Sequence, residues 1–169
     1  MGVTVTSPHG VDLTDALKRF PDEVSRHVLA GMDRATALLI RELESSTSIG
    51  ATGELAKSWT AGSEIQSPGH VAAEVGTELE HGVYAELGTR PHWAPIAPLL
   101  NWVVNGPIGE KDEASAKRIA YAVQAKIAKK GTDGQYTLRN AYTKTLNDMT
   151  KALQNSMEDA ISEIVGNGQ

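Results

Sequence analysis

Hydrophobic residues recur at helical spacing over several long stretches of the chain. The clearest early stretch has apolar residues at intervals of three or four: Val24, Val28, Met32, Ala35, Leu39 and Leu43. This spacing places them on one face of a helix, which we expect to end near Glu44, before the small residues of SSTSIGATG. A shorter helical face over residues 13–20 should stop at Pro21, because proline lacks a backbone N–H. Before it, alternating residues around Val3 and Val5 predict a short strand.

Two further helices are predicted in the second half of the chain. Residues 96–104 carry Pro98 in a position that suits a first helical turn, with an apolar face of Leu99, Leu100, Trp102 and Val103. Residues 113–131 end at Gly131, a natural C-terminal cap, and their apolar stripe is Ala116, Ile119, Ala120, Val123 and Ile127.

The last helical pattern is the longest in this half, about 28 residues or roughly 40 Å of helix. Its apolar positions are Leu138, Tyr142, Leu146, Met149, Leu153, Met157, Ile161 and Ile164. A stripe of that length on a small domain should lie along another helix or another subunit. Acidic residues crowd its end, at Glu158, Asp159 and Glu163, against the helix dipole. Either the end frays, or a basic surface of a partner meets it.

A β-hairpin is predicted between the helical stretches. Residues 57–66 and 70–77 flank Pro68-Gly69, a pair that suits the centre of a type II turn, and Val71, Ala73 and Val75 alternate on one face. Together the elements predict an α+β fold: a long N-terminal helix, a small antiparallel β-sheet with a hairpin, and several further helices including a long C-terminal helix. We expect residues 1–150 to form a single domain and residues 151–169 to be the end of the last helix and a tail that makes an assembly contact.

Composition narrows the functional classes. The chain has 169 residues and no cysteine, which excludes disulfides, thiolate metal sites and cysteine nucleophiles. Its apolar runs are far shorter than the roughly 20 residues that span a bilayer. The first residues lack a secretory pattern, and their weak match to a myristoylation pattern, through Gly2 and Thr6, stands alone. We therefore expect a soluble protein made in a cytosol, with no membrane partner. A formal charge of −5 argues against a dedicated nucleic-acid binder.

Candidate catalytic residues do not form any known pattern. His70, His81 and His92 recur at intervals of eleven, whereas zinc sites keep two ligands two to five residues apart. No serine stands in an elbow of the G-x-S-x-G type, and GTDGQY lacks the lysine of a phosphate-binding loop. We expect no enzyme activity, no cofactor and no metal. A metal-dependent hydrolase built on the three histidines is kept as the weakest of three functional hypotheses.

One flank of the helix over residues 113–131 is basic, with its cations at Arg118, Lys126, Lys129 and Lys130. Cations in the last turn complement the helix dipole, so a solvated face explains them. The alternative is contact with an acidic partner or with DNA phosphates, which makes a nucleic-acid-binding module the second functional hypothesis.

The segment YAELGTRPHWAPIAPLLNWV, residues 84–103, combines a Gly-Thr turn with three prolines and two tryptophans. Gly88 suits the end of a short helical turn, and the prolines stiffen the following connector. Trp93 stands between two of them, either as a plug on the core or as an exposed anchor. A stiff loop loses little entropy on binding, so we expect a subunit or partner interface at Tyr84, Glu86, Gly88, Thr89, Arg90, Pro91, His92 and Trp93.

The same segment resembles a family of tailed-bacteriophage tail components, the tail-completion or neck proteins similar to minor tail protein Z. The resemblance rests on Tyr84, Ala85, Glu86, Gly88, Thr89, Pro91, Pro95, Pro98, Leu99, Trp102, Ile127, Ala128, Gly131 and Thr132, with Thr52, Gly53, Leu55 and Ser58 upstream. It runs from about residue 24 to residue 145. Leu87 departs from it where an aromatic residue is usual, and so do Ile49 and Gly50 in place of a proline-containing segment.

The resemblance implies a structural virion protein of the phage neck or tail top. Such a protein forms a homo-oligomeric ring, a hexamer by analogy with tail symmetry, and helps to join a completed tail to a DNA-filled head. Its implied partners are further copies of itself, a tail terminator or tail tube protein, head-closure or connector proteins, and DNA that passes through the channel without specific binding.

Overall fold

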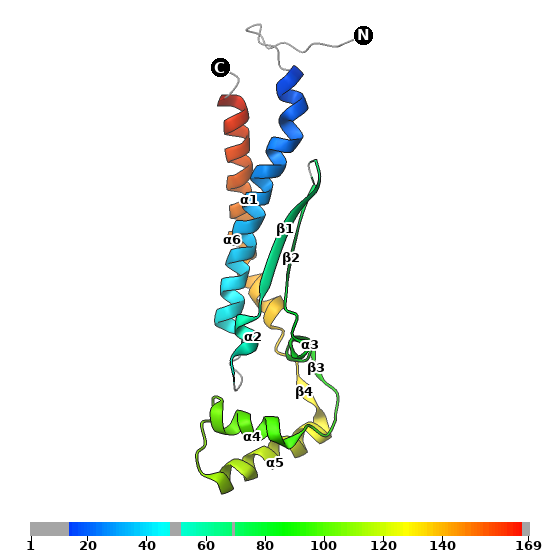
Figure 1. Cartoon of the computed structure of the whole chain (residues 1–169), viewed down its shortest axis with the longest axis vertical. Helices are drawn as coiled ribbons and strands as arrows, with labels where there is room; N and C mark the ends of the chain where they lie inside the picture. The colour runs from blue at the N-terminus through cyan, green and yellow to red at the C-terminus, as the bar shows by residue number, and fades with distance from the viewer. Residues whose placement is uncertain (1–13, 48–51, 69, 167–169) are drawn as a thin grey trace. The chain divides into compact units, whose positions relative to one another are not determined.

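The computed structural model of the chain describes residues 14–47, 52–68 and 70–166, with side chains described between residues 21 and 163. These residues form two compact units. The first unit combines the chain up to Ile40 with Ala61–Val75 and the chain from Thr145 onward, and the second combines Arg41–Thr60 with Gly76–Lys144. The α+β prediction is confirmed: the elements include long helices near both ends of the chain and a β-hairpin (Figure 1).

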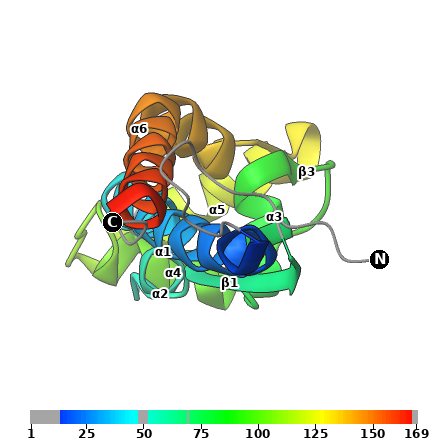
Figure 2. The same cartoon turned by 90° about the horizontal axis from the view of Figure 1, so that it is seen from above.

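Two long helices run antiparallel through the first unit. They are α1, Thr14–Ser46, and α6, Thr137–Gly166, and both views place them side by side (Figures 1 and 2). Arg34 of α1 donates a hydrogen bond to Ser156 Oγ of α6, 2.5 Å away. A β-carbon added at Gly31 would lie only 2.5 Å from the same oxygen. Glycine therefore allows the two helices to approach closely at this point.

The expected helix end at Pro21 is wrong, because α1 continues through this residue. Proline removes one backbone donor, but a helix of 33 residues retains its ladder on both sides of that gap. The Ser25 hydroxyl donates to the Pro21 carbonyl oxygen at 2.6 Å and gives this carbonyl an additional partner. The predicted end near Glu44 is confirmed within two residues. The strand expected around Val3 and Val5 lies outside the described residues.

The long C-terminal helix is confirmed, but several large apolar residues of its predicted stripe are exposed. Leu146, Met157 and Ile161 are exposed. In the first unit the face of α6 that is buried or half-buried carries Thr145, Met149, Ala152, Ser156 and Ala160, and Leu153 beside it is also half-buried. These positions recur at intervals of three or four residues, so they form one helical face of their own. Residue 150, the expected end of the main domain, lies within α6, and that division stays a prediction.

The acidic end of α6 has a partner inside the chain that the sequence did not suggest. Glu163 Oε2 lies 2.8 Å from His27 Nε2 of α1. This pair crosses between the two helices of the first unit, so it accounts for one of the three acidic residues that oppose the helix dipole.

The predicted hairpin is confirmed in the strands β1, Thr60–Ser67, and β2, His70–Gly76, which pair with each other. Val71, Ala73 and Val75 are half-buried, whereas most of β1 is exposed. Lys57 belongs to the one-turn helix α2, Glu54–Lys57, instead of the first strand. Gly69, expected in the turn, lies outside the described residues.

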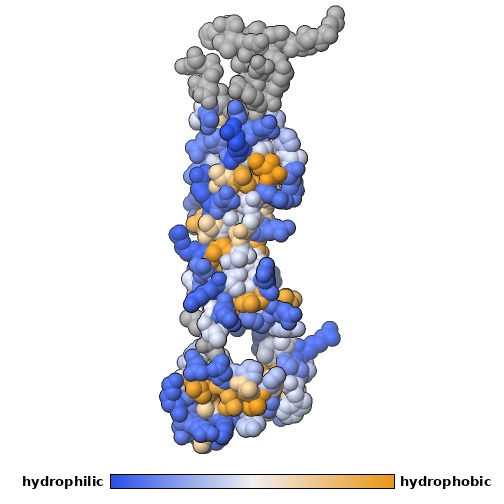
Figure 3. Space-filling model, in the orientation of Figure 1, coloured by the Kyte–Doolittle hydropathy of each residue, from blue (hydrophilic) through white to orange (hydrophobic). Residues whose placement is uncertain are grey.

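The second unit contains a helical hairpin with its own small core. The helices are α4, Ile96–Asn105, and α5, Glu113–Lys130, both close to their predicted bounds. Val103 packs with Ala116 and Ala120 at full burial, and Leu99, Leu100 and Trp102 pack partly buried against them. Trp102 therefore faces inward as predicted. Figure 3 shows apolar side chains among polar ones on the visible surface over this hairpin.

Side-chain hydrogen bonds fix the ends of two helices in the second unit. The buried Trp59 Nε1–H donates to Thr47 Oγ1 at 2.9 Å, which attaches the start of β1 to the end of α1. Asp112 Oδ2 accepts the Ser115 N–H at 2.8 Å and caps α5. Hydrogen bonding from the Ser115 side chain and from its backbone N–H holds the pKa of Asp112 below its ordinary value. The hydrogen bond and charge of Lys117 likewise lower the pKa of Glu113.

Candidate assembly surface

The segment predicted to form an interface crosses another part of the second unit and pairs with it as a sheet of two very short strands. After α3, Glu80–Leu87, the strand β3, Gly88–Thr89, pairs antiparallel with β4, Thr132–Asp133. The hydroxyl oxygens of Thr89 and Thr132 lie 3.0 Å apart, and the Thr132 N–H donates to Thr89 Oγ1. Two further backbone hydrogen bonds flank this pairing. The Gln135 N–H donates to the Ala85 carbonyl oxygen, and the His92 N–H donates to the Ile127 carbonyl oxygen.

Glycines permit this close crossing. Gly88 has φ 77° and Gly131 has φ 72°, both with extended ψ, in a region that only glycine adopts readily. A β-carbon at Gly88 would lie 2.2 Å from the Thr132 carbonyl oxygen, and one at Gly131 would lie 1.9 Å from that of Thr89. One at Gly134 would lie 2.5 Å from the Glu86 carbonyl oxygen. The two segments can therefore cross in this way only with glycine at these positions.

Glu86 has a role that its place in the predicted interface did not suggest. Its carboxylate is half-buried and accepts the backbone N–H groups of Leu138 and Arg139, at 2.9 and 3.2 Å. These are free donors of the first turn of α6, so Glu86 caps that helix from a distant part of the sequence. Tyr136, just before the helix, takes φ 52°, which is uncommon for a residue with a side chain. A contact of Glu86 with a partner stays a prediction.

The proline-containing connector after β3 holds its tryptophan outward. Gln124 Nε2 of α5 donates to the Ala94 carbonyl oxygen at 2.7 Å, next to Trp93. His92 Nδ1 lies 2.9 Å from the carbonyl oxygen of Arg90, so this histidine contacts its own loop. The Trp93 side chain is 75% exposed. Trp93 is therefore not a plug on the core, and its role as an anchor for a partner stays a prediction.

Trp93 is one of several large apolar residues that this segment leaves exposed. Tyr84 is 58% exposed and Leu87 66%, and Val83 beside them is exposed to a similar extent. Val83 and Leu87 are four residues apart on α3, so they lie on one helix face. We call Val83, Tyr84, Leu87 and Trp93 the 83–93 surface. Its apolar side chains stand on a backbone that the crossing with residues 131–136 holds in place.

The basic flank of α5 is exposed, as predicted. Arg118 donates to Ser115 Oγ within its own helix, and Lys129 and Lys130 occupy the last turn. Across the described residues, Lys126, Lys129 and Lys130 make no ion pair. A solvated face that complements the helix dipole accounts for this arrangement, and contact with an acidic partner or with DNA stays a prediction.

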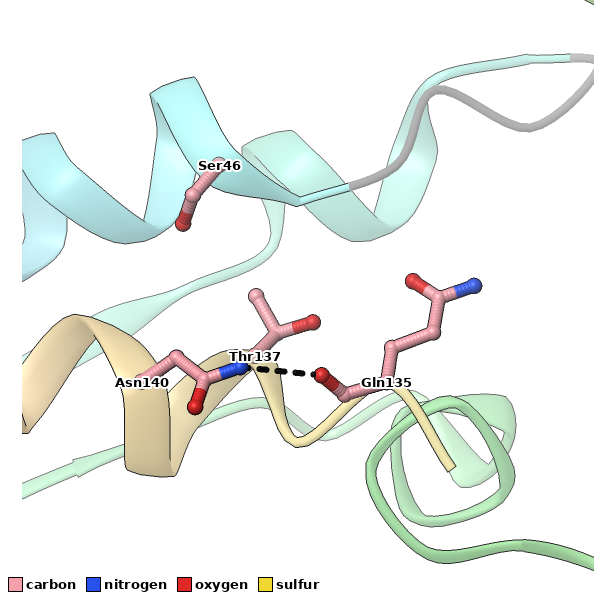
Figure 4. Close-up of a pocket in the computed structure, with 4 residues that line it drawn as sticks. All are labelled: Ser46, Gln135, Thr137 and Asn140. Atoms are coloured by element: carbon pink, nitrogen blue, oxygen red, sulfur yellow. Dashed lines mark hydrogen bonds between the residues drawn. The ribbon is translucent and has the colours of Figure 1, made fainter. Parts of the chain in front are cut away.

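Little in the described chain resembles a chemical site. His70, His81 and His92 are exposed on separate elements, and within the described residues no group of three or more metal-ligating side chains gathers. One hollow of about 340 Å³ lies in the second unit (Figure 4). Its walls are Ser46, Gln135, Thr137 and Asn140, and Asn140 Nδ2 donates to the Gln135 carbonyl oxygen at 3.2 Å. None of these four residues carries a charge or a nucleophile activated by a neighbouring base. None of the described helices is long and apolar enough to cross a membrane.

Comparison with known proteins identifies one family. Residues 12–88 match the sequence model of the family described as "Bacteriophage HK97-gp10, putative tail-component". No curated protein matches the chain. No solved structure matches it either. The match covers α1, the β-hairpin and α3, and it ends at the start of β3. The resemblance beyond residue 88 stays a prediction, and so does the similarity to minor tail protein Z. The predicted relationship to a bacteriophage tail-component family is confirmed by this match, which covers residues 12–88.

Proposed function

We propose that this tail component is a structural protein of the phage neck or tail top, where copies of it form a ring that completes the tail and helps to join it to the filled head. The family match supports the tail assignment. The ring, a hexamer by analogy with tail symmetry, extends that assignment. Within the proposal, the ring contacts a tail terminator or tail tube protein on one side and head-closure or connector proteins on the other, and DNA passes through it without specific binding.

The observation that carries the proposal is the 83–93 surface. Large apolar side chains that are more than half exposed and lie close together in sequence are unusual for a protein that works alone. Tryptophan and tyrosine are also the residues that most often dominate the energy of an interface. Because the crossing at Gly88 and Gly131 fixes the backbone beneath them, these side chains lose little freedom on binding.

The proposal also agrees with how the second unit is built. Its helical hairpin buries only small residues fully besides Val103, so its core is thin. Contact with a neighbouring subunit would add apolar burial where the isolated chain has little. In a ring of identical subunits, each copy contacts its two neighbours through two different surfaces.

The test is complementation of a phage that lacks this gene. Without the protein, negative-stain microscopy should show tails that fail to join heads. Wild-type protein should restore joining, whereas Trp93→Ala should lower the yield of joined virions at least tenfold with unchanged thermal stability of the isolated protein. Tyr121→Ala is the matched control, because Tyr121 is a 57% exposed aromatic residue of α5 outside the 83–93 surface. Gene-free tails that still join heads and infect would refute the function, and a normal yield with Trp93→Ala would refute the surface.

A further inference from the structure

The helix α3 presents one continuous exposed face with an acidic end. Its exposed residues on this face stand three or four positions apart, at Glu80, Val83, Tyr84 and Leu87. They therefore share one side of the helix, and Gly82 on the opposite side is buried. Glu80 makes no ion pair within the part of the chain that the structure describes. We call these four residues the α3 face, which combines large apolar side chains with a carboxylate at the start of the helix.

One flank of α5 has the opposite charge. Ala122 and Lys126 are exposed there and Ile119 is half-buried, and the three residues fall within about 60° of one another around the helix. Lys129 and Lys130 follow in the last turn. After its first residue, α5 carries no carboxylate. We call Ile119, Ala122 and Lys126 the α5 flank, which is apolar and shallow toward the middle of the helix and cationic toward its end.

The α3 face and the α5 flank have the same spacing when they are read in opposite directions. Along α3 the residues run from Glu80 through Tyr84 to Leu87, in steps of four and three. Backward along α5 the flank runs from Lys126 to Ile119 in the same steps. An antiparallel pairing therefore places Glu80 opposite Lys126 and Leu87 opposite Ile119. Tyr84 then meets the small alanine between them, so large side chains of one helix enter a shallow part of the other.

We propose that the α3 face of one copy packs antiparallel on the α5 flank of the next copy. This inference rests on the proposed ring and names the two surfaces that each copy would use in it. Charge selects the occupant, because Glu80 of one copy meets Lys126 of the next, whereas two α5 flanks would bring their lysines together. Antiparallel helix dipoles also favour the contact. Since the two surfaces differ, the contact is head-to-tail, as a ring requires.

Cysteine cross-linking tests this pairing, because the natural chain contains no cysteine. In concentrated solution under mild oxidation, a mixture of Tyr84→Cys and Ala122→Cys chains should form a disulfide dimer, since the two positions lie opposite each other. Neither variant should dimerise alone, because a head-to-tail contact does not set a position against its own counterpart. The matched control replaces Ala122→Cys with Lys117→Cys, at an exposed α5 position about 140° around the helix from Ala122. That mixture should stay monomeric.

Charge reversal in the phage provides a second, independent measurement. Glu80→Lys and Lys126→Glu should each lower the yield of joined virions about tenfold, because each sets like charges against each other at every contact of the ring. The chain with both substitutions has an opposite-charge pair at each contact again, so its yield should return to within about threefold of wild type. The thermal stability of each isolated variant shows that the chain is folded.

Failure of this pairing and failure of the proposed function give different results. Tails without the protein that still join heads would refute the function. If wild-type protein restores joining but the Tyr84→Cys and Ala122→Cys mixture stays monomeric, the pairing is wrong, and the 83–93 surface contacts a different protein of the virion. The same conclusion holds if the double charge variant regains no yield. Cross-linking of either cysteine variant alone would refute the head-to-tail arrangement.

Discussion

Gly131→Ala tests whether the crossing of β3 and β4 sustains the second unit. Gly131 has φ 72° and ψ −156°, a conformation that costs a residue with a β-carbon about 2 kcal/mol. The added β-carbon would also lie 1.9 Å from the Thr89 carbonyl oxygen. Relieving that overlap requires a backbone shift of about 1 Å, at a cost of about 2 kcal/mol. We therefore expect the free energy of unfolding of the second unit to fall by about 4 kcal/mol.

Gly109→Ala is the matched control for this substitution. Gly109 also has a positive φ, 64°, but an added β-carbon there meets no atom within 4 Å. Only the backbone cost remains, about 1 kcal/mol. Urea unfolding followed by tryptophan fluorescence reports the unfolding of the second unit in both variants, because Trp59, Trp93 and Trp102 all belong to that unit. If the two alanine variants unfold within about 1 kcal/mol of each other, close approach at Gly131 does not hold this unit together.

Further substitutions probe three individual contacts. Glu86→Ala should destabilise the second unit by about 2 kcal/mol, because two backbone donors at the start of α6 lose a charged acceptor; Glu86→Gln should lose less in the same urea assay. The pKa of Asp112 is lower in the folded protein than in the unfolded chain, where it is about 3.9. The Asp112 carboxylate therefore stabilises the fold above that pH, and this stabilisation is lost as the pH falls through the lower folded-state pKa. Faster amide exchange at the start of α5 below about pH 4 would show this, and Asp112→Asn, which caps without titrating, should abolish the pH dependence. Gly31→Ala should destabilise the first unit by about 1 kcal/mol, as overlap with Ser156 outweighs the gain in helix propensity. Adding Ser156→Gly should restore protection of α6 amides from hydrogen exchange.

Periodicity made α1, α4, α5 and α6 predictable, because each of them carries apolar residues at helical spacing. The bounds expected for α4 and α5 agree with the structure within one residue, and Gly131 ends α5 as its position indicated. The error at Pro21 has a different origin. A proline predicts a helix end from local backbone chemistry alone, and the flanking turns outweighed that local cost.

Periodicity could not predict the contacts that organise the candidate surface, because these contacts join residues that are far apart in the sequence. Glu86 caps a helix that begins some fifty residues later, and nothing near Glu86 in the sequence indicates that partner. Gly88 and Gly131 each suggested the end of a helix, but the function that they share with Gly134 is close approach of two segments. A pair of glycine-rich stretches, ELGT and GTDG, was the available signal. Only tertiary contact shows that they meet.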